Sequence, residues 1–455
     1  MRLALLLLSL WWLPAALPAA APLTLDEAVA RALEVDPRLE ARRQEVAKAR
    51  ALVAEVDGHL GARAEFNGFV GISPAVRGSP FTADPCGGSG NPPCTLRRDR
   101  YSLEQGLSPW LYTQFTIVKP ITTFGKVDPY REAARANVRV KTEAVRLTRG
   151  EIRLQVGQAY FGYLAARDGA AFLRDARRRV EKAERLIQRW LDTGEGEATP
   201  ADLYAIQAGG ALVDGYLAEA EGLQRVAEAA LRLLVRLPEG TELALAERRL
   251  TPLPPPADPL DTLRRKALRQ RPEMVQLEAG LEARRALVKA NKLAHRPNLY
   301  IGVAGTLSHS PGRESLDNPY VYDPFNDYGM TPVVGLQWDW QPELQKAKVD
   351  QARAELEALI AEGEFARRGI PFEVAEQYHQ AEAARQAVER LEAGARAARR
   401  WLVATYTDFE AGLKPADKLA TAFQAYVLAY SQYLQTVYRY NMHRLRLDQV
   451  TGAYP

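Results

Sequence analysis

A seven-residue repeat of apolar residues is the feature that most limits what this chain can fold into. Eight positions spaced by seven are all apolar, namely Val138, Val145, Ile152, Ala159, Ala166, Leu173, Val180 and Ile187. Such a run is typical of a coiled-coil seam, along which one face of a helix packs against a neighbouring helix. The repeat predicts one helix from about 127 to 191, about 100 Å long at about 1.5 Å per residue. No compact globular domain contains a rod of that length.

The same structural unit occurs twice along the chain. Three short runs recur in the same order: Ala32-Leu33 to Pro37 as Ala267-Leu268 to Pro272, Arg189-Trp190-Leu191 as Arg400-Trp401-Leu402, and Pro200-Ala201-Asp202 as Pro415-Ala416-Asp417. The proline-rich segment 251–258 cannot be helical and separates the copies as a linker. We therefore predict repeats over 22–250 and 259–455, each built as helix, two strands, long helix and helix. The first helix is expected from about Leu25 to Leu60.

Each repeat contains two segments in which apolar residues alternate with polar or small ones. The predicted strands are about 62–72, 101–121, 298–308 and 331–341. One apolar and one polar face fit the wall of a transmembrane β-barrel. Trp110, Tyr112, Trp338 and Trp340, close to the strand ends, suit an aromatic girdle at the membrane interface. A soluble β-sandwich is the alternative, but it offers no surface that matches the long helices.

Four strands cannot stand in lipid alone, because both edges of the sheet would leave backbone groups unpaired in hydrocarbon. The chain must therefore associate with copies of itself. Two copies give eight strands, whose interior side chains nearly fill, whereas three give twelve strands and an open lumen. The sequence therefore favours a hollow tube that crosses a membrane and continues as helices.

The N-terminus and the cysteines indicate export from the cytoplasm. Arg2, the apolar run 3–13 and the small residues 19–21 form a signal peptide over 1–21. Cys86 and Cys94 bracket a Gly- and Pro-rich turn, which predicts a disulfide in an exported protein. A metal site is the alternative, but two thiolates without a nearby histidine leave a tetrahedral ion half-coordinated.

The segment 120–126, Pro-Ile-Thr-Thr-Phe-Gly-Lys, lies between the second predicted strand and the long helix and resembles the joint of a known protein family. With the two Pro-Ala-Asp turns and the duplicated architecture, the chain resembles the TolC-like outer-membrane channels of Gram-negative efflux and type I secretion systems. The resemblance implies an α+β membrane protein: a homotrimer with a twelve-stranded barrel in outer-membrane lipid, continued by a periplasmic α-helical barrel. It also implies an equatorial belt built from the linker and the C-terminal segment. In the second copy, Trp338 to Glu343 departs from the family's strand-to-helix joint.

The resemblance also implies a gate at the periplasmic end, formed by segments 191–202 and 402–417. The family's pattern of an aromatic residue, glycine, a basic residue and aspartate matches Phe409, Gly412, Lys414 and Asp417. Three copies of Asp417 around one axis attract cations, and Lys414 and Asp202 are the predicted latch partners. The alternative is that Asp202 and Asp417 only begin helices, where the helix dipole favours a carboxylate.

Catalytic and cofactor signals are weak. Glu376 and His379 match half of a di-iron helix motif, but a second Glu-x-x-His is missing from the sequence. The sequence also lacks a phosphate-binding Gly-x-x-x-x-Gly-Lys-Ser/Thr loop. We therefore expect no enzyme activity, no cofactor and no metal. A net charge of +4 over 455 residues is too dilute for a nucleic-acid-binding groove.

The expected function is that of a passive exit duct for small molecules or proteins. It is expected to work when docked to an inner-membrane pump and a periplasmic adaptor protein, since the chain has no nucleotide-binding loop of its own. The alternative is a periplasmic coiled-coil adaptor. Adaptors typically have one helical hairpin and a lipoyl-like domain, whereas this chain has two repeats with membrane-type strands.

Overall fold

The computed structural model describes residues 22–78, 81, 85, 87–194, 198–238, 241–314 and 322–453. The predicted signal peptide, 1–21, and Cys86 lie outside the described residues, so the predicted Cys86–Cys94 disulfide stays a prediction. The chain divides into two compact units. The helical unit comprises Met1–Glu45, Lys141–Gln276 and Gly363–Pro455, and the sheet unit comprises Val46–Val140 and Leu277–Glu362.

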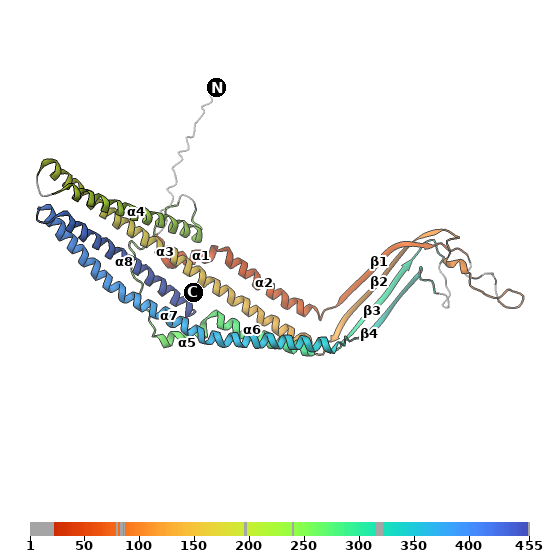
Figure 1. The fold of residues 1–455 in the computed structure, drawn as a ribbon. Helices are drawn as coiled ribbons and strands as arrows, with labels where there is room; N and C mark the ends of the chain where they lie inside the picture. The colour runs from red at the N-terminus through yellow and green to blue at the C-terminus, as the bar shows by residue number, and fades with distance from the viewer. Residues whose placement is uncertain are drawn as a thin grey trace, which may run out of the picture. The chain divides into compact units, whose positions relative to one another are not determined.

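Both halves of the chain contain the same elements in the same order (Figure 1). The first half contains α1 (Leu25–Val35), α2 (Pro37–Gly58), β1 (Arg63–Pro74), the short 3-10 helix η1 (Arg98–Tyr101), β2 (Leu107–Thr122), α3 (Val127–Thr193) and α4 (Pro200–Val235). The second half contains α5 (Leu260–Gln270), α6 (Pro272–Leu293), β3 (Asn298–His309), β4 (Asp327–Gln337), α7 (Pro342–Glu410) and α8 (Ala416–Val450). Two helices, two strands and two helices therefore follow one another in each half, as the sequence repeat predicts.

The predicted first helix is two helices rather than one. α1 ends at Val35 and α2 begins at Pro37, with extended backbone at Asp36 (ψ 118°). A proline lacks the amide hydrogen that a helix interior needs, but it fits the first position of a new helix. The second half breaks in the same way, between Gln270 and Pro272. The expectation of one helix over 25–60 was wrong for this reason.

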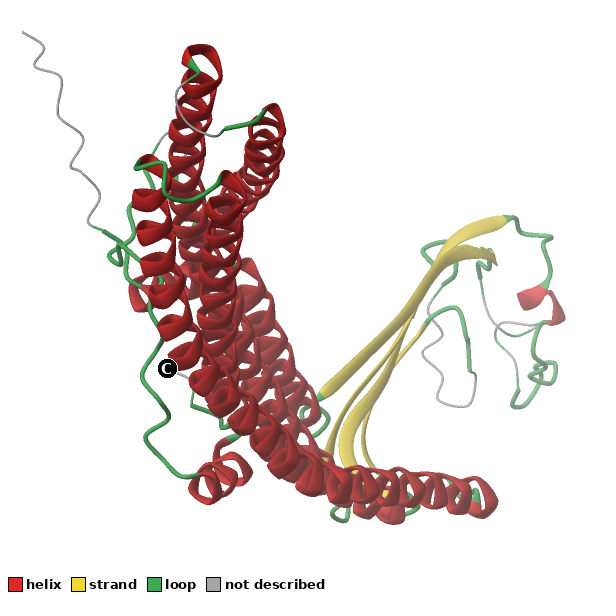
Figure 2. Cartoon of the chain, turned by 60° about the vertical axis from the view of Figure 1, so that its left-hand side comes forward, coloured by secondary structure: helices red, strands yellow, loops and turns green. Residues whose placement is uncertain are grey.

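The seven-residue seam forms the core of the helical unit. In this unit the seam residues of α3 are buried from Ile152 to Ile187, and Val145, one repeat earlier, is half-buried. The matching residues of α7 are buried as well, namely Val374, Ala381, Val388, Ala395 and Leu402. Residues of α3, α4, α7 and α8 share one apolar cluster near the hairpin turns. Figure 2 shows the long helices of this unit lying alongside one another. The coiled-coil prediction is confirmed for this unit.

The sheet unit contains one four-stranded antiparallel sheet in the order β1-β2-β3-β4. Its central pair joins the two halves of the chain, because β2 comes from the first half and β3 from the second. The strands at its two edges, β1 and β4, each pair with one neighbour among the described residues. The sheet is therefore open at both edges within a single chain.

Two strands begin and end at other residues than predicted. β2 begins at Leu107 rather than near 101, because Gly106 turns the chain with a φ of +92°. β4 spans Asp327–Gln337 rather than 331–341. Trp338 follows β4, and its indole Nε1 donates to the carbonyl of His295 at 2.8 Å. Trp338 and Trp340 therefore lie in the short connection to α7.

The joint between β2 and α3 is a tight turn, as the segment 120–126 suggests. Phe124 and Gly125 both have positive φ angles, of 52° and 80°. Thr122 Oγ1 accepts the amide of Phe124 at 3.1 Å, and the Arg296 guanidinium donates to the Phe124 carbonyl at 2.8 Å. These bonds offset the strain of a left-handed phenylalanine. None of the residues from Trp338 to Gln341 has a positive φ, so the two joints differ.

No helix of the described residues is long and apolar enough to cross a membrane.

Candidate functional site

The sheet has one apolar face. Alternate residues of each strand point to this face, and the register aligns them across the four strands. Almost all of these residues are apolar. The residues are Ala64, Phe66, Gly68, Val70 and Ile72 on β1; Pro109, Leu111, Thr113, Phe115, Ile117 and Lys119 on β2; Leu299, Ile301, Val303, Gly305, Leu307 and His309 on β3; and Tyr328, Met330, Pro332, Val334 and Leu336 on β4. We call this the apolar face.

The opposite face, here called the polar face, holds mainly small and hydrophilic residues, and its larger apolar or aromatic members are Phe69, Trp110, Tyr112, Val118, Tyr300 and Val333. It includes Arg63, Glu65 and Asn67 on β1, Gln114 and Thr116 on β2, Gly302, Thr306 and Ser308 on β3, and Asp327, Thr331 and Gln337 on β4. The predicted alternation is thus continuous across four strands. A sheet with one hydrophobic and one hydrophilic face separates two different solvents.

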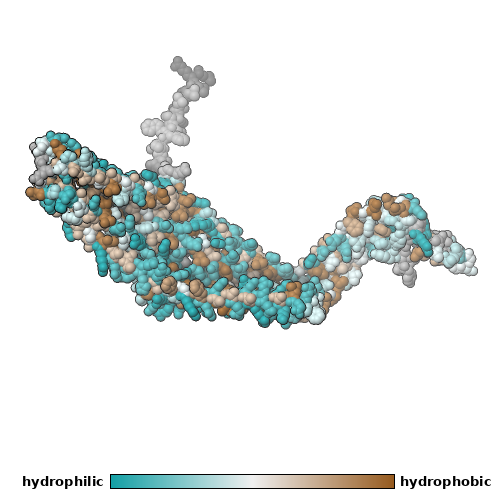
Figure 3. Space-filling view, viewed as in Figure 1, coloured by the Kyte–Doolittle hydropathy of each residue, from teal (hydrophilic) through white to brown (hydrophobic). Residues whose placement is uncertain are grey.

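The apolar face is exposed in the single chain. Val70 on β1 is 77% exposed and Val334 on β4 is 70% exposed. Figure 3 shows hydrophobic side chains gathered over the sheet. Water-soluble monomers rarely leave so large an apolar patch uncovered. The face therefore needs a cover that the chain itself does not supply among its described residues.

The four predicted girdle residues do not share a face. Trp110 and Tyr112 lie on the polar face, in register with Gly71 and Phe69. Trp338 and Trp340 follow the end of β4, are both exposed, and have ring centroids 6.3 Å apart. The pleat thus turns Trp110 and Tyr112 away from the apolar face. The sequence prediction grouped all four residues by their position along the strands and did not consider the face to which each one points.

The sheet has a proximal end, formed by Arg63, Thr122, Asn298 and Gln337, from which the chain continues into helices. Its distal end is formed by Pro74, Leu107, His309 and Asp327. The distal end is held by a buried ion pair between Arg313 and Asp323, whose side chains are 1% and 4% exposed.

Arg313 makes several bonds at this distal end. Its Nε and Nη2 donate to the two carboxylate oxygens of Asp323 at 3.1 and 3.0 Å, and Nη1 donates to the carbonyl of Pro74 at 2.6 Å. Two parallel bonds fix the guanidinium plane. The sequence pattern did not point to Arg313, because its partner lies in a loop and not at a periodic position.

The hairpin turns of the helical unit contain the predicted gate residues. Phe409 is 1% exposed and packs against Trp190, with ring centroids 5.1 Å apart. It is therefore a core residue that joins the ends of α3 and α7. A side chain so fully buried cannot line a pore in this conformation.

The two Pro-Ala-Asp aspartates occupy different environments. Asp202 belongs to the capping box of α4: its Oδ2 accepts the Thr199 amide at 2.9 Å and the Thr199 hydroxyl at 2.6 Å. Asp417 stands in the first turn of α8, which has no side-chain cap, and it faces Lys418 at 3.3 Å. The alternative interpretation, in which the aspartate only begins a helix, therefore accounts for Asp202. It does not account for Asp417 in the same way, because the Asp417 carboxylate caps no helix and stays exposed.

Lys414 forms an ion pair within its own turn. Its Nζ lies 2.7 Å from Oδ2 of Asp408, and both side chains are partly exposed. Within the described residues the chain therefore pairs Lys414 with Asp408, and not with the predicted latch partner Asp202.

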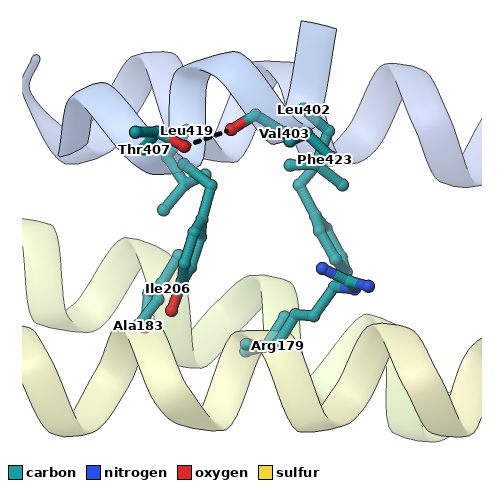
Figure 4. A pocket seen from close by; sticks show the side chains of 10 residues that line it. Arg179, Ala183, Ile206, Leu402, Val403, Thr407, Leu419 and Phe423 are labelled. Atoms are coloured by element: carbon teal, nitrogen blue, oxygen red, sulfur yellow. Dashed lines mark hydrogen bonds between the residues drawn. The ribbon is translucent and has the colours of Figure 1, made fainter. Parts of the chain in front are cut away.

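A small pocket opens beside these turns. Figure 4 shows Ala183 of α3 and Ile206 of α4 on one side, opposite Leu402 of α7 and Leu419 of α8. The walls are mostly apolar, and Arg179 is the one charged residue among those that line the pocket. The pocket lies between the two helical hairpins of one chain, near the buried Phe409.

The candidate metal-ligating and acid–base groups of the described residues lie apart from one another. The described residues contain no group of three or more His, Cys, Asp or Glu side chains placed to hold a metal ion. Glu376 and His379 are both exposed on α7. Burial lowers the pKa of His443, which lies 3.2 Å from the amide oxygen of Gln377. These groups stand singly, and their arrangement suits no general acid–base pair.

Asp168 is a partly buried carboxylate with a structural role. Burial raises the pKa of Asp168 above its usual range, and its Oδ2 accepts the amide of Leu250 at 2.7 Å. The bond ties the segment before the proline-rich linker to α3.

The comparison with protein families gives one match. Residues 263–453 match the model of a family described as outer membrane efflux protein. No curated protein matches the sequence significantly.

Solved structures of similar fold cover nearly the whole chain. CusC, whose structures concern folding and transmembrane channel formation, is 16% identical, with a TM-score of 0.72 over 94% of this chain and 92% of that chain. The CmeC outer membrane channel of Campylobacter jejuni is 15% identical, with a TM-score of 0.73 over 94% and 85%. The outer membrane protein VceC of Vibrio cholerae is 13% identical, with a TM-score of 0.72 over 94% and 96%. At these identities the likeness shows a shared fold.

Proposed function

We propose that the chain forms a passive outer-membrane exit duct, because residues 263–453 match the outer membrane efflux protein family and nearly the whole chain shares the fold of solved outer-membrane channels. The duct crosses the outer membrane with its sheet and extends into the periplasm with its helices. Proteins of this family are transport conduits and not enzymes. The energy for export comes from a partner.

One observation carries the proposal: the sheet has two open edges and an exposed apolar face. In hydrocarbon, each unpaired backbone group costs several kcal/mol, so an open sheet is not tolerated. Closing the edges against further copies of the same sheet pairs those groups, and lipid covers the apolar face. The polar face then lines the bore.

Three copies satisfy this requirement best. Three four-stranded sheets give twelve strands, which leave an aqueous lumen, whereas two sheets give a nearly filled barrel. The resemblance to the TolC-like channels likewise implies a trimer that docks with adaptor and pump proteins. We therefore infer a homotrimer that discharges cargo received from an inner-membrane pump through a periplasmic adaptor.

The aromatic residues take separate roles in this arrangement. Trp338 and Trp340 follow the proximal end of the sheet and are exposed, so they suit the periplasmic membrane interface. Trp110 and Tyr112 point to the bore, because they belong to the polar face. We do not assign these two to the girdle.

The resting gate lies at the helical hairpin turns. Asp417 is the residue best suited to it, because its carboxylate is exposed and takes no part in a cap. The Lys414–Asp408 ion pair holds the turn before α8 in its present form. Docking of an adaptor at these turns opens the duct.

Reconstitution tests the proposal. Purified protein in planar lipid bilayers is expected to give stepwise ion conductance, and the native protein is expected in the detergent-extracted outer-membrane fraction. A periplasmic adaptor would instead remain water-soluble without detergent and leave the bilayer silent. That result would overturn the channel assignment in favour of the adaptor.

A further inference from the structure

Three aromatic residues gather on the polar face near the distal end of the sheet, whereas a fourth, Tyr300, lies on the same face near the proximal end. Phe69 and Tyr112 stack with ring centroids 5.1 Å apart and planes 28° apart, and Trp110 meets Phe69 edge-on at 4.8 Å. Their neighbours on this face are small or polar, such as Asn67 and Gln114. We call Phe69, Trp110 and Tyr112 the aromatic cluster.

The cluster is held in place by polar groups behind it. The Trp110 indole donates to Ser308 Oγ at 2.8 Å, and that hydroxyl donates to the carbonyl of Pro324 at 2.7 Å. Phe325 packs against Trp110 at 4.9 Å, and the Arg313 guanidinium stacks over Phe325 at 4.6 Å. Asp323 fixes Arg313, and Arg313 in turn holds Phe325 against Trp110. The rings of the aromatic cluster are therefore already ordered before a ligand binds, which lowers the entropy cost of binding.

The front of the cluster is open. Phe69 is 49% exposed, although it lies on the face that lipid does not cover in the proposed barrel. An aromatic ring that stays exposed to water forgoes the stabilisation that its burial would give to the fold. A role in contacting molecules within the bore accounts for their position.

A carboxylate lies in the same row of the sheet. The register places Phe69, Tyr112, Ser308 and Asp327 side by side across the four strands. Tyr112 and Asp327 are two strands apart, or about 10 Å. Asp327 has no hydrogen-bond or ion-pair partner for its side chain among the described residues, and the nearby Arg313 is already neutralised by Asp323.

We propose that the aromatic cluster and Asp327 form a binding site for planar aromatic cations inside the bore, near its outer mouth. Aromatic faces attract cations and stack on flat rings, and the carboxylate supplies the opposite charge. The inference rests on the proposed channel function, because that function makes the polar face the pore wall. Each trimer carries three such sites.

Titration of proflavine, a planar three-ring cation, against the intact detergent-solubilised protein tests the site by fluorescence anisotropy. Phe69→Ala is expected to weaken binding roughly tenfold, since it removes one stacking ring. Asp327→Asn is expected to weaken it several-fold, and the effect should fall at high salt. Tetraethylammonium, a cation without a flat ring to stack, is expected to compete much more weakly than an unlabelled planar aromatic cation.

Phe66→Ala is the matched control. It removes the same side chain three residues away on β1, from the apolar face, and is expected to leave proflavine binding unchanged. Equal losses in Phe66→Ala and Phe69→Ala, or no binding by the wild-type protein, would overturn the site.

Conductance of the same preparations separates the two proposals. Wild-type protein that conducts ions but does not bind proflavine contradicts the site and leaves the channel intact. Protein that binds proflavine through Phe69 but never conducts overturns the channel and, with it, the placement of the aromatic cluster in a bore.

Discussion

At the scale of single residues, two equivalent aspartates differ because of one neighbour. Asp202 follows Thr199, whose hydroxyl completes a capping box with it. The residue in the matching position before Asp417 is Lys414, which cannot accept an amide hydrogen and pairs with Asp408 instead. The exchange of threonine for lysine therefore leaves the carboxylate of Asp417 outside any helix cap, exposed beside Lys418.

Asp417→Ala is expected to weaken the block of single-channel current by divalent cations, because three carboxylates near one axis bind such ions. Single-channel recording in planar bilayers with added Mg²⁺ measures the effect. Asp261→Ala is the control, since Asp261 is also an exposed aspartate in the first turn of a helix. Unchanged block in Asp417→Ala would remove this residue from the gate.

Asp168→Asn is expected to stabilise the protein slightly at pH 7, by about 1 kcal/mol. The pKa of Asp168 is raised by burial, so the folded state binds the proton more tightly than the unfolded state does. The ionised carboxylate therefore lowers stability increasingly as pH rises above 3.8 and through the raised pKa. The asparagine oxygen still accepts the Leu250 amide.

Thermal unfolding in detergent, followed by circular dichroism at pH 7 and pH 4, measures this difference. The advantage of Asp168→Asn over the wild type should shrink at pH 4. Asp168→Ala leaves the Leu250 amide without an acceptor and is expected to destabilise the protein by about 1–2 kcal/mol at both pH values. An advantage of Asp168→Asn that grows on acidification would contradict the assignment.

At the scale of elements, the pleat of the strands decides which solvent each side chain meets. Successive residues point to opposite faces, so Phe66 and Asn67 of β1 lie on different sides of the sheet. Trp110 and Tyr112 show the same effect, because their place near a strand end suggested a girdle whereas their row belongs to the polar face.

Phe66→Lys is expected to impair assembly in the membrane by about 2–4 kcal/mol per copy, the cost of a lysine facing the middle of the bilayer. Asn67→Lys is expected to cost little, since it faces the aqueous bore. Heat-resistant migration of the oligomer on SDS gels, measured for both variants, gives the comparison. Similar losses for the two variants would contradict the assignment of the faces.

At the scale of the whole molecule, the chain is incomplete alone. β1 and β4 each have one neighbour among the described residues, and the apolar face between them has no cover. Both features disappear only when several chains share one barrel. We therefore propose that the oligomer is part of the fold and not an addition to it.

Chemical cross-linking of the detergent-solubilised protein is expected to give trimers as the largest major species, with dimers as intermediates. The reason is that twelve strands leave a lumen and eight do not. Size-exclusion chromatography with light scattering checks the mass independently of the cross-linker. A stable dimer as the final species would contradict a wide bore.

The long helices and the alternation of the strands could be predicted from the sequence, because both depend on local periodicity. The seam from Ile152 to Ile187 is buried, and the alternating rows form two distinct faces. The break before Pro37 was missed, although proline is a local signal, since the apolar pattern continues across it. The Arg313–Asp323 pair gave no periodic signal at all.

The sequence by itself determined which residues are helical, which strands alternate and that the unit is repeated, since each depends on neighbours along the chain. Only the tertiary structure decided which strands pair, which face Trp110 occupies, and that Phe409 is buried against Trp190. Those facts depend on contacts between residues far apart in the sequence. Local periodicity contains no information about such contacts.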